Sequence, residues 1–142
     1  MNTETKTARV LLADDHAEML TQTRNVLAED FEIVGAVGNG FDVIKATAQY
    51  DPDVVVLDIT MPGLDGIEAA RRLSKSGCRA KLVFLSVHED QDYVRAALRS
   101  GGSAYVVKTR LGSDLVPAIC EVVAGRRFVS PSLSWNEGRQ DE

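Results

Sequence analysis

Short apolar runs alternate with longer segments of helical periodicity along most of this chain. The runs lie at residues 10–13, 31–37, 54–57, 82–85 and 105–107 and are rich in valine, leucine and isoleucine. Apolar runs without interruption are typical of strands that are covered on both faces, as in a parallel sheet. The second run contains Glu32 and is the least uniform of the set.

The segments between and after the runs predict five helices. Their apolar residues recur every three or four positions, which gives each helix one apolar face. The pattern is clear in the last segment, at Leu115, Ile119 and Val122, and weakest in residues 41–50. Five strands alternating with five helices predict a doubly wound α/β fold, with a five-stranded parallel sheet and helices on both of its faces.

The length of the chain predicts one domain with a tail at each end. Of the 142 residues, we assign 9–125 to the folded domain and 1–8 to an N-terminal tail. We interpret residues 126–142 as a C-terminal tail, or as the start of a linker to a further domain.

The composition excludes several classes of protein. The chain is 44% hydrophobic and 26% charged, as in ordinary soluble proteins, and its net charge of -5 argues against nucleic-acid binding by this chain itself. Its polar start predicts no secretory signal, and no apolar run reaches the length of a membrane span. Cys78 and Cys120 lack disulfide or zinc spacing, so we interpret both as small buried residues and expect a cytoplasmic protein.

Polar residues stand directly after four of the five apolar runs. Asp14 and Asp15 follow the first run, Asp58 the third, Ser86 the fourth and Lys108 the fifth. Ligands of open α/β sheets bind at the carboxyl ends of the strands. We therefore expect these side chains to converge on one edge of the sheet.

Three carboxylates in one place favour a bound cation. Each pair about 4 Å apart repels by about 4 kcal/mol at an effective dielectric constant of about 20. Mg²⁺ prefers oxygen ligands and keeps several waters, so it suits such a cluster. His16 is the one histidine beside these strand ends, which makes zinc a poor fit.

Each of these residues also has an ordinary structural interpretation. Asp14 or Asp15 could cap a helix, Ser86 could be a turn residue, and Lys108 could be solvated surface. Asp58 is harder to explain in this way, because it follows four apolar residues of a buried strand. The functional prediction rests on the set rather than on any single member.

As a set, these residues resemble the CheY-like receiver domain of bacterial two-component response regulators. The matching motifs are the acid pair within residues 12–16, the segment 58–66, Ser86, and Lys108 at the end of residues 105–108. The segment 58–66 and the ending 125–131 are most similar to receivers of NarL/LuxR-type transcriptional regulators. The resemblance implies a flavodoxin-like sheet with strand order 2-1-3-4-5.

The resemblance also implies a phosphorylation site. Asp58 would be the phosphoacceptor, taking a phosphoryl group from a phosphohistidine of a sensor kinase or a phosphotransfer protein. Lys108 would neutralise charge on the phosphoryl oxygens, and Ser86 would hydrogen-bond the phosphoryl group. Ser86 and Tyr105 stand at the switch positions of the family, where Tyr105 would turn inward; without the family, a half-buried tyrosine with its hydroxyl at the surface is expected.

The metal implied by the resemblance is Mg²⁺. Asp15, Asp58 and the backbone carbonyl of Thr60 would be direct ligands, and Asp14 would act through a metal-bound water. For His16 a surface position at the start of a helix is expected, and for His88 a plain loop position.

The resemblance further implies signalling partners. Phosphorylation would favour a homodimer through the face formed by the fourth helix, the fifth strand and the fifth helix. In the NarL/LuxR group a DNA-binding domain follows the receiver, and the residues after Pro131 are too few to form one. The chain is then either a stand-alone receiver or a fragment. The resemblance favours the fragment, in which DNA binding would belong to an output domain absent from this chain.

Three other functions stay open. A receiver-like module that never takes phosphate would act by interaction alone. A Mg²⁺-dependent hydrolase with an aspartate nucleophile generally carries a second acid two positions later, where this chain has Thr60. A nucleotide-binding domain would need a glycine-rich loop after the first strand, which the sequence lacks. We expect a switch rather than an enzyme with a separate turnover substrate.

Overall fold

Six parallel strands form the sheet of this protein, in the order β2-β1-β3-β4-β5-β6. The computed structural model describes residues 7–135. Within them the strands are β1 (Arg9–Ala13), β2 (Glu32–Val37), β3 (Val54–Leu57), β4 (Lys81–Ser86), β5 (Gly102–Val107) and β6 (Phe128–Val129).

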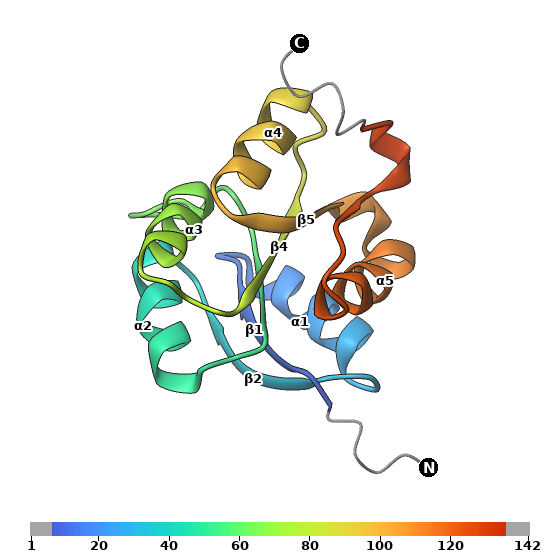
Figure 1. Cartoon of the computed structure of the whole chain (residues 1–142). Helices are drawn as coiled ribbons and strands as arrows, with labels where there is room; N and C mark the ends of the chain where they lie inside the picture. Colours follow the sequence, from blue (N-terminus) through green and yellow to red (C-terminus); the bar gives the residue numbers. More distant parts are fainter. Residues whose placement is uncertain (1–6, 136–142) are drawn as a thin grey trace.

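The helices cover both faces of the sheet (Figure 1). They are α1 (Ala17–Leu27), α2 (Gly40–Tyr50), α3 (Gly66–Lys75), α4 (Gln91–Arg99) and α5 (Leu111–Val123), with two short 3₁₀ turns, η1 (Lys108–Arg110) and η2 (Pro131–Leu133). Helices α1 and α5 lie on one face, and α2, α3 and α4 on the other. The predicted doubly wound fold and the order of its five-strand core are confirmed.

Two hydrophobic clusters, one on each face, explain why the central strands are apolar throughout. Along β1, Val10 and Leu12 point to the cluster under α1 and α5, whereas Leu11 and Ala13 point to the cluster under α2, α3 and α4. All four residues of β3 are buried, because this strand is covered on both faces. Strand β2 lies at the sheet edge and is half exposed, which accommodates Glu32.

A sixth strand, beyond the five that were predicted, lies within the segment interpreted as a C-terminal tail. Phe128 pairs with Ala104 and Val129 with Tyr105, parallel to β5. A two-residue strand is too short to show a periodic pattern, so the sequence carried little signal for it. Residues 136–142 of the expected tail, and residues 1–6 of the N-terminal one, lie outside the described residues.

Two smaller outcomes concern the surface. Cys78 is half-buried and Cys120 lies exposed on α5, so the expectation that both are buried was wrong for Cys120. Among residues 7–135, no helix has both the length and the apolar character that a membrane crossing requires.

The loop from β3 to α3 is folded tightly against the end of β3. Asp65 caps α3, since its Oδ1 accepts a hydrogen bond of 2.8 Å from the Glu68 N–H. The Gly66 N–H donates to the Ile59 carbonyl at 2.7 Å. A Cβ atom at Gly66 would lie 1.9 Å from the Asp58 carbonyl oxygen. Only glycine therefore fits where this loop passes the strand end.

We predict that Gly66→Ala destabilises the fold by about 3 kcal/mol or more, because the new methyl group meets backbone atoms that side-chain rearrangement does not move. Urea unfolding followed by circular dichroism measures the change. Gly112→Ala, on α5, is the matched control: no neighbouring atom lies within 4 Å of the added Cβ, and it should be neutral or stabilising by up to about 1 kcal/mol. Equal stability of the two variants would contradict the packing described for Gly66.

Candidate functional site

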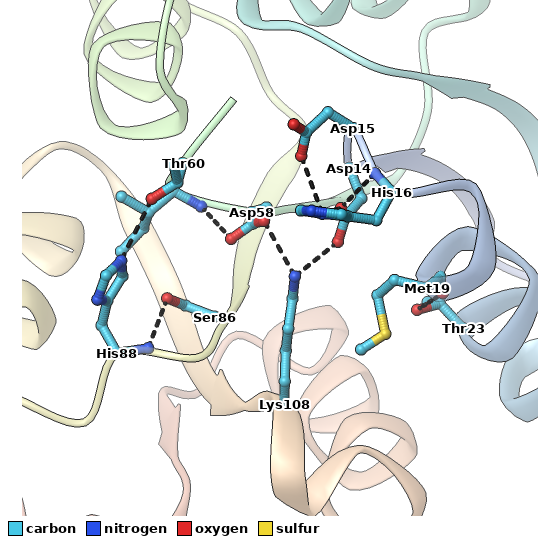
Figure 2. A network of polar contacts seen from close by, with 11 residues as sticks. Asp14, Asp15, His16, Met19, Thr23, Asp58, Thr60, Ser86, His88 and Lys108 are labelled. Carbon is cyan, nitrogen blue, oxygen red and sulfur yellow. Dashed lines mark hydrogen bonds and ion pairs between the residues drawn. The ribbon is translucent and has the colours of Figure 1, made fainter. Parts of the chain in front are cut away.

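The register of the sheet brings the predicted acids together. Ala13 at the end of β1 pairs with Leu57 at the end of β3. The pairing continues one step further, since the Asp58 N–H donates to the Ala13 carbonyl at 3.0 Å. Asp14 and Asp58 therefore leave neighbouring strands at the same level, and Figure 2 shows their side chains facing each other.

Lys108, which follows β5, reaches between these two carboxylates. Its Nζ lies 2.8 Å from Asp14 Oδ2 and 3.0 Å from Asp58 Oδ2. The three side chains are at most 10% exposed. This is a buried group of charges in which one ammonium is shared by two carboxylates.

Burial and neighbouring charges shift the acid–base properties of this group. Burial raises the pKa of Asp58, and the Asp14 carboxylate raises it further, against the opposing attraction of Lys108. For Lys108 burial alone would lower the pKa, but the hydrogen bonds and charges of Asp14 and Asp58 raise it above its usual value. Lys108 is therefore held as a cation at neutral pH.

Both oxygens of the Asp58 carboxylate have a hydrogen-bond donor. Oδ1 accepts a hydrogen bond of 2.7 Å from the Ile59 N–H, while Oδ2 faces Lys108. These contacts hold the carboxylate in one orientation at the end of the buried strand β3. A fixed, partly desolvated carboxylate is suited to act as a nucleophile or as a metal ligand.

A candidate cation site lies between Asp58 and the acid pair. Asp14, Asp15, His16 and Asp58 each offer a ligand atom, and these atoms all lie within 4.8 Å of one another. Carboxylate oxygens are the ligands that Mg²⁺ prefers, so the donor set fits this ion. The role of the Thr60 backbone carbonyl as a further ligand stays a prediction.

His16 contacts both acids of the pair. Its Nδ1 lies 3.1 Å from Asp14 Oδ1 and 3.1 Å from Asp15 Oδ1, although 68% of the side chain is exposed. His16 is the N-cap residue of α1, at the helix start where a surface position was expected. The capping role considered for Asp14 or Asp15 therefore does not hold, although Asp14 Oδ1 accepts a hydrogen bond from the His16 N–H.

Ser86 and Tyr105 are joined through one loop residue, His88. Ser86 is fully buried, and its Oγ accepts a hydrogen bond of 3.1 Å from the His88 N–H. The Tyr105 hydroxyl donates to the His88 carbonyl at 2.7 Å. Burial raises the pKa of Tyr105 to about 12. Tyr105 is fully buried, so the half-buried ring with a surface hydroxyl, expected only without the family resemblance, is not observed.

The imidazole of His88 makes contacts that the sequence did not reveal. Its Nε2 lies 3.2 Å from Thr60 Oγ1, and its ring stacks on Tyr93 with 3.9 Å between ring centres. His88 lies in the β4–α4 loop, as expected, and its ring contacts Thr60 and Tyr93 there. The available signal was its position two residues after Ser86, as Thr60 is two after Asp58.

Comparison with known proteins identifies the family. The response regulator receiver domain model matches residues 10–119. Response regulator GacA of Pseudomonas aeruginosa is 34% identical over 128 residues, which are 89% of this chain and 60% of that protein. The nitrate/nitrite response regulator NarL of Escherichia coli is 32% identical over 129 residues, again 89% of this chain and 60% of the relative.

The fold has the same relatives. A two-component response regulator of the LuxR family from Aurantimonas sp. superposes with a TM-score of 0.86 and 30% identity, over 91% of this chain and 94% of that one. The chain spans about 60% of the length of the curated relatives named above. With the strand-end acids, Lys108 and the matched sequence all in agreement, this chain belongs to the response regulator receiver domain family, and its relatives are response regulators of the NarL/LuxR type.

Proposed function

We propose that this protein is a phosphorylation switch that accepts a phosphoryl group on Asp58. The group would come from the phosphohistidine of a sensor kinase or of a phosphotransfer protein. The observation that carries the proposal is the Asp58 carboxylate itself, held at one oxygen by a backbone N–H and at the other by Lys108. Phosphoryl transfer depends mainly on positioning and on neutralising charge, and this arrangement provides both.

Mg²⁺ is the cofactor that the donor set supports. Asp15, Asp58 and the Thr60 carbonyl would bind it directly, and Asp14 would do so through water. The ion would supply positive charge to the transferring phosphoryl oxygens. The chain's own contribution is to hold the acids together against their mutual repulsion, and Lys108 already does so for Asp14 and Asp58.

Lys108 would serve the transfer directly. Its ammonium lies beside the Asp58 oxygen that faces the site, so it would neutralise charge on the phosphoryl oxygens as the new bond forms. The product is an acyl phosphate on Asp58, which is labile and suits a reversible signal. In this proposal the protein assists its own phosphorylation and dephosphorylation without a separate turnover substrate.

The switch would start at Ser86. Its Oγ would turn to the phosphoryl group and give up the hydrogen bond that it now accepts from His88. Because Tyr105 is already buried, the expected inward turn of its ring does not start from the surface here. The change would instead alter the β4–α4 loop and the face formed by α4, β5 and α5.

That face would carry the response to partners. Phosphorylation would favour a homodimer through α4, β5 and α5. The longer relatives are named as regulators, and DNA binding in a longer protein of this kind would belong to its output domain.

The hydrolase alternative is weakened at Thr60. Such an enzyme would need a second acid at this position, and here the Thr60 hydroxyl contacts His88 instead.

We expect incubation with a small phosphodonor and Mg²⁺ to add one phosphoryl group, measured by intact mass spectrometry. The gain should require Mg²⁺ and vanish in Asp58→Asn. Asp53→Asn, at the opposite end of β3, is the control and should be labelled like the wild type. Absence of any gain with several donors, in a folded protein, would favour the interaction module; repeated turnover of the donor far beyond one equivalent would favour the hydrolase.

We expect Lys108→Met to slow phosphorylation by about 10²–10³, because one preorganised charge contact to the transferring group is lost. Time-resolved mass spectrometry at fixed donor and Mg²⁺ gives the rate, and circular dichroism verifies that the variant is folded. Lys81→Met is the matched control, since Lys81 is exposed at the other end of the sheet. Equal phosphorylation rates for the two variants would show that Lys108 has no role in the phosphoryl transfer.

We expect Asp58→Asn to raise the free energy of unfolding at pH 7. The raised pKa of Asp58 means that the folded state binds this proton more tightly than the unfolded state, so keeping the group ionised costs stability above the folded pKa. As pH falls through the folded pKa towards about 4, the advantage of the asparagine should disappear. Urea unfolding across pH tests this, and a variant less stable than wild type at pH 7 would show that the Lys108 attraction outweighs burial.

A further inference from the structure

The last residues that the structure describes are hydrogen-bonded to the edge of β5. Figure 1 shows it in red beside β5. Ser130 is fully buried there and forms two hydrogen bonds with that strand. Its N–H donates to the Tyr105 carbonyl at 2.9 Å, and its Oγ accepts from the Val107 N–H at 3.1 Å. The two hydrogen bonds therefore engage the β5 backbone on either side of residue 106, at the Tyr105 carbonyl and the Val107 N–H.

The same segment is also fastened to α4. The Leu133 side chain is buried in the cluster that contains Val94 and Leu98 of α4. The Leu133 carbonyl accepts a hydrogen bond of 3.0 Å from Gln91 Nε2 at the start of that helix. Further along, the Arg95 guanidinium lies 5.7 Å from the centre of the Trp135 ring. Residues 128–135 therefore occupy part of the face formed by α4 and β5.

The contacts with α4 are less complete than those with β5. Within the described residues, Trp135 Nε1 and Arg95 Nε are buried without a hydrogen-bond partner. A buried donor that lacks a partner weakens the state in which it is buried. On β5, in contrast, both polar groups of Ser130 are satisfied. Release of the segment would therefore begin at its α4 end.

One loop connects these contacts with the proposed acceptor site. His88 donates its N–H to Ser86 Oγ and accepts the Tyr105 hydroxyl at its carbonyl. Gln91, which holds Leu133, begins α4 three residues later. If Ser86 Oγ turns to a phosphoryl group, the His88 N–H loses its acceptor. The loop would then shift to give this N–H another acceptor, and Gln91 would move with it.

We propose that residues 128–135 are an intramolecular ligand of the α4–β5 face, loosened when the acceptor site is occupied. The inference rests on the proposed function, because Ser86 is the link. It assigns an occupant to the face on which the response to phosphorylation would be expressed. A partner that uses the same face would have to displace this segment first.

Trp135 is the single tryptophan of the chain, so its fluorescence reports the segment directly. The experiment uses the whole 142-residue chain with Mg²⁺, beryllium and fluoride, which form a phosphoryl mimic. Fluorine NMR establishes whether the mimic is bound to the protein. On binding we expect acrylamide quenching of Trp135 to rise at least about twofold and the exchange of the Ser130 amide hydrogen to accelerate at least about tenfold, because opening exposes both.

Two variants test the route of the coupling. Gln91→Ala should increase Trp135 quenching without any mimic and leave fluoride binding unchanged, whereas Gln49→Ala, an exposed glutamine on α2, should do neither. Ser86→Ala should show increased quenching from the outset and no further response to the mimic. Bound fluoride with unchanged Trp135 and Ser130 signals would overturn the coupling and leave the proposed function intact. No bound fluoride in a folded protein would overturn both.

Discussion

The contact on which the site depends is the ammonium of Lys108 between the carboxylates of Asp14 and Asp58. Two buried carboxylates on neighbouring strand ends repel each other, and the shared cation offsets that repulsion. With Asp15 added, three carboxylates minus one ammonium leave a formal charge of -2 in the cluster at neutral pH. The cluster therefore keeps a net negative charge that would attract a divalent cation, as the proposed Mg²⁺ site requires.

The fold and most of the site could be predicted from the sequence, because in a parallel sheet the strands are apolar and the functional polar residues follow the strand ends. The buried strand β3 must be apolar on both faces, so its end is visible as the point where Asp58 interrupts the apolar run. The register of β1 and β3 then brings Asp14 beside it without further information. The fold and the convergence of the acids follow from local patterns of this kind.

What could not be predicted depends on packing between distant segments. The burial of Tyr105 depends on β6 and the β4–α4 loop, and β6 is too short to have a pattern of its own. The contact of His88 with Thr60 depends on the side-chain rotamers of two residues in different loops, and the spacing of residues in the sequence does not determine these. The exposure of Cys120 is different, because the apolar face at Leu115, Ile119 and Val122 already sets the phase of α5 and leaves Cys120 off that face.

These unpredicted contacts give the site its connection to the rest of the molecule. The acids and Lys108 could hold a phosphoryl group on any rigid scaffold, but these residues alone could not transmit its presence to another surface of the protein. To transmit the change, a group must be able to bind the phosphoryl group and must also hydrogen-bond to a neighbouring element. The Ser86 hydroxyl meets both conditions, because it accepts a hydrogen bond from His88 in the β4–α4 loop. His88 in turn receives the Tyr105 hydroxyl from β5, the strand on which Ser130 is held. A change at Ser86 is therefore felt first by the β4–α4 loop and the elements beside it, and this favours the α4–β5 face over α1 or α2 as the surface that responds.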